Sequence, residues 1–132
     1  LTICCIRHKM KGENMITYEI VFYEKPDGTE PVKDFIMNLL SKMQAKTIRI
    51  LDILQEFGPD LRMPYSKMLR DGIYEIRIIQ GNNCARVLYF FTCGNKIILT
   101  NGFIKKTQKT PGREIEIAQK YRKDYERRNK ND

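Results

Sequence analysis

The sequence predicts an α+β fold, in which a helical hairpin and a C-terminal helix pack on one antiparallel β-sheet. Three observations lead to this prediction. A β-rich segment comes first, two amphipathic helical patterns follow it, and three more β-rich segments precede a last helical pattern. The chain has 132 residues, which suits one compact domain, and its longest apolar runs are far too short to cross a membrane.

The first half of the chain predicts one strand and two helices. Residues 16–23 form the β-rich segment, and the turn residues Pro26, Asp27 and Gly28 close it. Pro31 is suited to a first helical turn, and apolar residues then recur at helical spacing: Val32, Phe35, Ile36, Leu39, Leu40 and Met43. A second helical pattern runs through Ile48, Leu51, Leu54 and Phe57 and ends at Gly58-Pro59.

The second half predicts a three-stranded meander and a closing helix. The strands cover about 73–80, 85–92 and 96–103, with turns at Gly81-Asn82-Asn83 and Cys93-Gly94-Asn95. Thr110-Pro111 then resembles an N-cap followed by a proline in the first turn. The apolar face of the helix comprises Ile115, Ala118, Tyr121 and Tyr125.

Two-residue turns would fix which residues share a face of the sheet. They pair Arg77 with Leu88 and Phe103 with Arg86, so that one open face carries Glu75, Arg77, Arg86, Asn101 and Phe103. The face under the helices would carry an apolar stripe: Tyr74, Ile76, Ile78, Val87, Tyr89, Phe91 and Ile98. A change of one residue in the first turn would move Arg86 to the other face.

Charge and composition favour a polyanionic partner and exclude several kinds of site. The net charge is +8, and residues 103–132 contain ten Lys or Arg against five Asp or Glu. The four cysteines lack zinc-site spacing, so free thiols in a reducing cytoplasm are expected. The one histidine is His8, in residues 1–14, which show no clear periodicity. Two interpretations of 1–14 stay open: a disordered arm, or a start assigned upstream of Met15, with 15–132 as the single domain.

The shared polar face suggests RNA chemistry. The ribose 2′-hydroxyl is an internal nucleophile, so cleavage needs a base, charge stabilisation of the phosphorane and an acid. The candidate base is a carboxylate such as Glu75 or a lysine with a depressed pKa. Arg77 and Arg86 are candidate phosphate ligands, with Lys105, Lys106, Lys109 and Arg70 as RNA- or ribosome-binding cations. The simpler reading of Glu75 and Arg77 is a solvated charge pair, and that of the lysines a solvated connector. No motif predicts a metal or other cofactor.

Three ordered motifs resemble the RelE/ParE toxin superfamily, specifically its phage-derived, HigB-like branch. They are Leu69-Arg70-Asp71-Gly72-Ile73-Tyr74-Glu75-Ile76-Arg77, then Ala85-Arg86-Val87-Leu88-Tyr89-Phe90-Phe91, then Gly102-Phe103-Ile104-Lys105-Lys106-Thr107-Gln108-Lys109-Thr110-Pro111. The resemblance runs from about Met15 to Tyr125. It implies a RelE-like fold and a type II toxin that cuts messenger RNA in the ribosomal A site without a metal, held inactive by a cognate antitoxin, expected to be a small helix-turn-helix protein.

The resemblance assigns the catalytic roles to Arg86, Arg77 and Glu75 and a cytoplasmic location to the protein. Several relatives use a histidine or a terminal tyrosine as the acid, and here only Tyr121 and Tyr125 offer a substitute. Two alternatives remain: a ParE-like inhibitor of DNA gyrase without catalysis, and an inactive phage-derived protein with the same fold.

Overall fold

A computed structural model of the chain describes residues 17–106 and 109–130. The elements follow in the order β1 (Glu19–Phe22), α1 (Pro31–Met37), α2 (Ser41–Phe57), a 3₁₀ turn η3 (Gly58–Asp60), β2 (Ser66–Arg70), β3 (Ile73–Gln80), β4 (Asn83–Phe91), β5 (Lys96–Ile104) and α3 (Gly112–Arg128). Residues 1–14, for which the sequence leaves two interpretations, lie outside the described residues, so the prediction of a single domain over 15–132 stays a prediction.

The predicted α+β class is confirmed. Five strands form one sheet in the order β1-β5-β4-β3-β2, and every neighbouring pair is antiparallel except β1 and β5, which are parallel. The parallel pair arises because the chain crosses the sheet through α1 and α2 before it returns to the strands. No helix in the described ranges has the length and apolar character of a membrane span.

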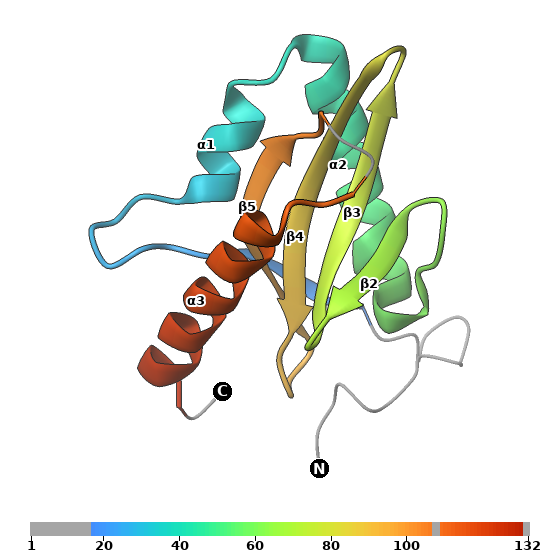
Figure 1. Cartoon of the computed structure of the whole chain (residues 1–132). Helices are drawn as coiled ribbons and strands as arrows, with labels where there is room; N and C mark the ends of the chain where they lie inside the picture. Colours follow the sequence, from blue (N-terminus) through green and yellow to red (C-terminus); the bar gives the residue numbers. More distant parts are fainter. Residues whose placement is uncertain (1–16, 107–108, 131–132) are drawn as a thin grey trace.

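The helices cover both faces of the sheet rather than one. The hairpin of α1 and α2 packs on one face over a core that includes Val32, Ile50, Leu54 and Val87. Helix α3 lies on the opposite face, over Leu88, Phe90 and Ile98 (Figure 1). The expectation that the arginine-bearing face would be open is therefore corrected, because α3 occupies part of it.

The first helix is shorter than the apolar spacing suggested. It ends at Met37, and Met43 belongs to α2 instead. Asn38 ends the helix, because its side-chain amide donates to the carbonyl oxygen of Asp34 at 2.9 Å, and Leu40 takes an extended conformation before α2. Helix α2 ends at Phe57 as predicted, and Gly58 follows with φ +52°.

A strand irregularity explains the one wrong member of the predicted apolar stripe. Ile98 packs under α3, whereas the other six residues lie on the face of α1 and α2. The register between β4 and β5 shifts between Leu88 and Tyr89, opposite Thr100, whose hydroxyl donates to the Leu88 carbonyl oxygen at 3.1 Å. The shift reverses the side-chain alternation beyond it, so Ile98 changes face.

Gly102 on β5 allows α1 to approach the sheet closely. A Cβ atom at this position would lie 2.5 Å from Cδ2 of the Phe35 ring. We expect Gly102→Ala to lower the free energy of unfolding by about 1–3 kcal/mol, because Phe35 would have to leave its position. Urea unfolding measures the effect. Gly112→Ala is the matched control, since a Cβ there meets no atom within 4 Å, and an equal loss in both variants would contradict the packing argument.

Candidate active site

The sheet register brings the predicted catalytic side chains to one face. Arg77 of β3 pairs directly with Arg86 of β4, which in turn pairs with Phe103 of β5, while Glu75 pairs with Leu88. The predicted pairing between β3 and β4 was wrong by two positions, because the turn is formed by Gly81 and Asn82. An error of two preserves the alternation, so the prediction that Glu75, Arg77, Arg86, Asn101 and Phe103 share a face is confirmed.

Glu75 and Arg86 form a buried ion pair in the centre of this face. The two residues are only 4% and 2% exposed, and 3.5 Å separates Arg86 Nε from Glu75 Oε2. Arg86 Nη1 also donates to Cys84 Sγ at 2.8 Å and to the Ala85 carbonyl oxygen at 3.1 Å. The prediction that Arg86 lies on an open face is wrong, because the guanidinium is enclosed and lies against Glu75.

The other oxygen of the Glu75 carboxylate is also bound. The hydroxyl of Thr110 donates a hydrogen bond to Glu75 Oε1. Thr110 lies just before α3, and that helix is attached to the sheet where Asn101 Nδ2 donates to the carbonyl oxygen of Glu114 at 3.2 Å and to its Oε1 at 3.0 Å. The start of α3 therefore fixes the orientation of the carboxylate.

Arg77 differs from Arg86 because it has no carboxylate partner among the described residues. Its Nη1 donates to the thioether Sδ of Met63 at 3.1 Å, which is a weak acceptor. Its Nε, like that of Arg86, is buried and has no hydrogen-bond acceptor in the described part of the chain. A guanidinium in this state favours the arrival of an anion, since a bound phosphate would supply the missing acceptors.

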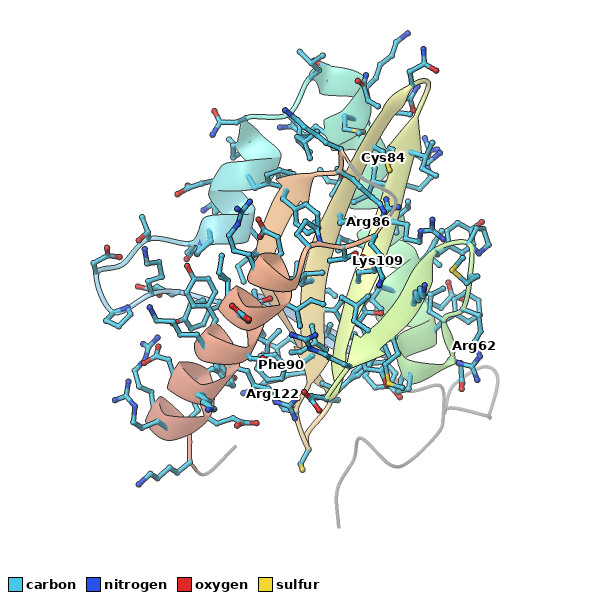
Figure 2. The ribbon with its side chains drawn as sticks, in the orientation of Figure 1. Arg62, Cys84, Arg86, Phe90, Lys109 and Arg122 are labelled. Carbon is cyan, nitrogen blue, oxygen red and sulfur yellow. The ribbon has the colours of Figure 1, made fainter. Side chains whose placement is uncertain are left out.

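Glu75, Arg77 and Thr110 line an open pocket of about 400 Å³, which we call the Glu75 pocket. Five cationic side chains and one carboxylate contribute to its lining: Lys67, Arg70, Arg77, Lys105, Lys109 and Glu75. Figure 2 shows Arg86 and Cys84 along β4 and Lys109 on the segment that leads from β5 to α3. The pocket thus combines strong positive charge with a potential proton acceptor.

The pocket brings together most of the predicted site residues but not all of them. Arg70, Lys105 and Lys109 line it with Glu75 and Arg77. Arg86 does not line it, and Lys106 lines a separate cleft beside Arg113 and Glu114. Lys67 and Thr110 were missed as site residues. Lys67 pairs with Glu75 across β2 and β3, a strand pairing that the sequence analysis did not predict.

Lys105 lies in the Glu75 pocket with its ammonium group partly buried. Its pKa is lowered from the usual 10.5, first by partial burial and then by the positive charge of Arg86, while the Glu75 charge acts in the opposite direction. Its backbone amide donates to the Cys84 carbonyl oxygen at 2.8 Å, which fixes the end of β5 beside β4.

The two tyrosines considered as acids lie elsewhere. Tyr121 stacks on Tyr23, with 4.6 Å between ring centroids, and Tyr125 makes an edge contact with Phe90. Both belong to the core between α3 and the sheet, and neither lines the Glu75 pocket. Arg122 adds to this core, since its guanidinium lies 5.1 Å from the centre of the Phe90 ring (Figure 2).

The arrangement suits the binding and cleavage of a phosphodiester. Over residues 17–106 and 109–130 no group of His, Cys, Asp and Glu side chains is arranged to hold a metal ion. The described cysteines, Cys84 and Cys93, are free thiols, as predicted. The groups present in the Glu75 pocket can hold a phosphate, accept a proton and donate one.

Comparison with known proteins identifies one family. The family model described as phage-derived protein Gp49-like (DUF891) matches residues 34–123, from within α1 to within α3. The matched range contains every residue that lines the Glu75 pocket. A search of curated proteins finds no match.

Proposed function

The chain belongs to the phage-derived Gp49-like family, a RelE/HigB-like toxin family, and from this membership we propose that it is a ribosome-dependent messenger RNA endoribonuclease. The family is commonly the toxin of a toxin–antitoxin system, which implies an antitoxin partner. Our proposal adds the HigB-like branch, the ribosome and the messenger RNA. The observation that carries it is the Glu75 pocket, where five cations surround one buried and oriented carboxylate.

The proposed reaction begins at the ribose. Glu75 accepts the proton of the 2′-hydroxyl, whose oxygen then attacks the neighbouring phosphorus. Arg77 binds the phosphate, because its guanidinium has no strong acceptor among the described residues and can bind two phosphate oxygens at once. The products are a 2′,3′-cyclic phosphate and a 5′-hydroxyl.

Arg86 acts on this reaction through Glu75. Because Arg86 is enclosed and bound to Cys84 and Ala85 as well as to Glu75, we assign it to holding the carboxylate rather than to touching the RNA. Thr110 has a similar task on the other carboxylate oxygen. We assign protonation of the leaving 5′-oxygen to Lys105, since it lines the pocket and burial makes its ammonium group more acidic.

The role of Lys105 predicts a pH dependence. Only the ammonium form donates a proton, so the rate of the wild-type cleavage step should fall as the pH rises through the lowered pKa of Lys105. Lys105→Arg keeps the positive charge at every accessible pH but is a very poor acid. We expect it to keep ribosome affinity while slowing cleavage by roughly 100-fold. Single-turnover rates over a series of rising pH values measure both effects, and a wild-type rate in Lys105→Arg would show that Lys105 is not the acid.

Induction of the protein in growing bacteria tests the function as a whole. If it cleaves messenger RNA, incorporation of labelled methionine should stop within minutes, before any change in plasmid supercoiling. An early loss of negative supercoiling would identify a gyrase inhibitor instead. Normal growth at high expression would contradict toxicity. Co-expression of the neighbouring antitoxin gene should restore growth. We propose that the antitoxin covers the Glu75 pocket with an acidic or amphipathic segment.

A further inference from the structure

A second cationic cleft lies along α3, away from the Glu75 pocket. It has a volume of about 600 Å³, and the two sites share no lining residue. The residues that matter are Lys120, Tyr121, Lys123, Asp124 and Arg127 of α3, together with Lys25 from the loop between β1 and α1. We call this the α3 cleft.

The positive charge of the α3 cleft is not balanced by the described residues. Its one carboxylate, Asp124, accepts hydrogen bonds from Tyr23 Oη at 2.6 Å and from Arg128 Nη2 at 2.6 Å, and it also binds Arg127. These partners hold the pKa of Asp124 below its usual range, the Arg128 hydrogen bond being the largest cause. Among the described residues, the ammonium groups of Lys25, Lys120 and Lys123 form no ion pair.

Three cations of the cleft lie on one side of α3, beside a stacked pair of tyrosines. Lys120, Lys123 and Arg127 are spaced by three and four residues, which places them on one side of α3 at about one per turn. Tyr23 and Tyr121 also line the cleft, and their rings stack with an angle of 23° between the ring planes. Burial first, and then the Asp124 hydrogen bond, raise the pKa of Tyr23 to about 12, so its hydroxyl remains a neutral donor.

Such a row matches a repeating anion better than a single one. The phosphates of a nucleic-acid backbone recur at regular intervals, and flexible lysines can follow them without reading a sequence. Helix α3 also connects the two sites, because Ile115 lines the Glu75 pocket and Lys123 lines the α3 cleft, about 12 Å further along the helix axis. If this protein binds RNA through the α3 cleft, the Glu75 pocket therefore lies close to the bound RNA.

We propose that the α3 cleft binds the phosphodiester backbone of ribosomal RNA and holds the protein on the ribosome. This inference rests on the proposed function, since it names a contact that the endoribonuclease would use to reach its substrate. The cleft contributes affinity, and the cleavage step belongs to the Glu75 pocket.

The test compares two double variants that change the net charge equally. Lys120→Glu/Lys123→Glu reverses two charges of the cleft, and Lys42→Glu/Arg49→Glu reverses two exposed charges on α2. With purified ribosomes and a programmed messenger RNA, we expect the cleft variant to raise the half-saturating ribosome concentration at least 10-fold. Its maximal cleavage rate should stay within twofold of wild type, and its binding should depend less steeply on salt. The α2 variant should behave like wild type.

The outcomes separate this inference from the proposed function. If the wild type cleaves and the cleft variant shows wild-type half-saturation, the inference is overturned. If the wild type does not cleave, co-sedimentation of the same proteins with ribosomes still tests the cleft, and lost binding in the cleft variant alone supports it. Weaker antitoxin binding with unchanged ribosome binding would assign the cleft to a protein and overturn the inference. Lys25→Glu, on a separate loop, repeats the test if the α3 variant fails to fold.

Discussion

Arg77→Ala should slow ribosome-dependent cleavage by roughly 10²- to 10³-fold, equivalent to about 3–4 kcal/mol of lost transition-state stabilisation. In the free protein this guanidinium contacts the Met63 thioether, and its Nε has no acceptor among the described residues. Its charge is thus available for the phosphorane. The free energy of unfolding should not fall much, because the substitution removes a buried donor that the fold leaves unsatisfied.

Single-turnover cleavage and urea unfolding of the same preparations measure the two effects. Arg62→Ala provides the matched control. Arg62, labelled in Figure 2, is an exposed arginine next to Met63, the residue that Arg77 contacts. It donates to the Pro59 carbonyl oxygen at 3.1 Å and does not line the Glu75 pocket. A wild-type cleavage rate in Arg77→Ala, or an equal loss in both variants, would show that Arg77 is not the phosphate ligand.

Arg86→Met should have the largest effect on stability, a loss of about 3–5 kcal/mol. The substitution leaves the Glu75 carboxylate, which is only 4% exposed, without its cationic partner. An exposed Arg86 would give a much smaller loss, so the measurement also tests the burial of the pair. Urea unfolding followed by circular dichroism measures it.

The double variant Glu75→Gln/Arg86→Met separates the structural role from the catalytic one. Removing both charges relieves the unpaired carboxylate, so most of the lost stability should return. Cleavage should remain absent, because the amide of Gln cannot accept the 2′-hydroxyl proton. Recovery of both stability and cleavage would mean that Glu75 is not the base.

The sequence predicted which residues share the face of the site, because a register error of two residues leaves side-chain alternation unchanged. Glu75, Arg77 and Arg86 therefore lie together although the β3–β4 register was wrong. It did not predict β2, whose residues Ser66 to Arg70 lack β-branched side chains and are mostly exposed at the sheet edge. For that reason Lys67 was missed.

The burial of the site residues could not be predicted from side-chain alternation. A period of two places Arg86 on a face but does not say what covers that face, and the burial of Arg86 depends on long-range contacts. The position of α3 on the same face is equally non-local, since its apolar residues would suit either side of the sheet. The hydrogen bond from Thr110 to Glu75 follows from that position.

Primer extension on a defined messenger RNA tests the central claim most directly. The messenger RNA is bound to purified ribosomes and treated with wild-type protein, Arg77→Ala or Arg62→Ala, with a sample of free messenger RNA alongside. The account predicts new 5′ ends within the ribosome-bound codons for the wild type and Arg62→Ala, and almost none for Arg77→Ala or for free messenger RNA. Absence of cuts by the wild type, or equal cutting by Arg77→Ala, would contradict it.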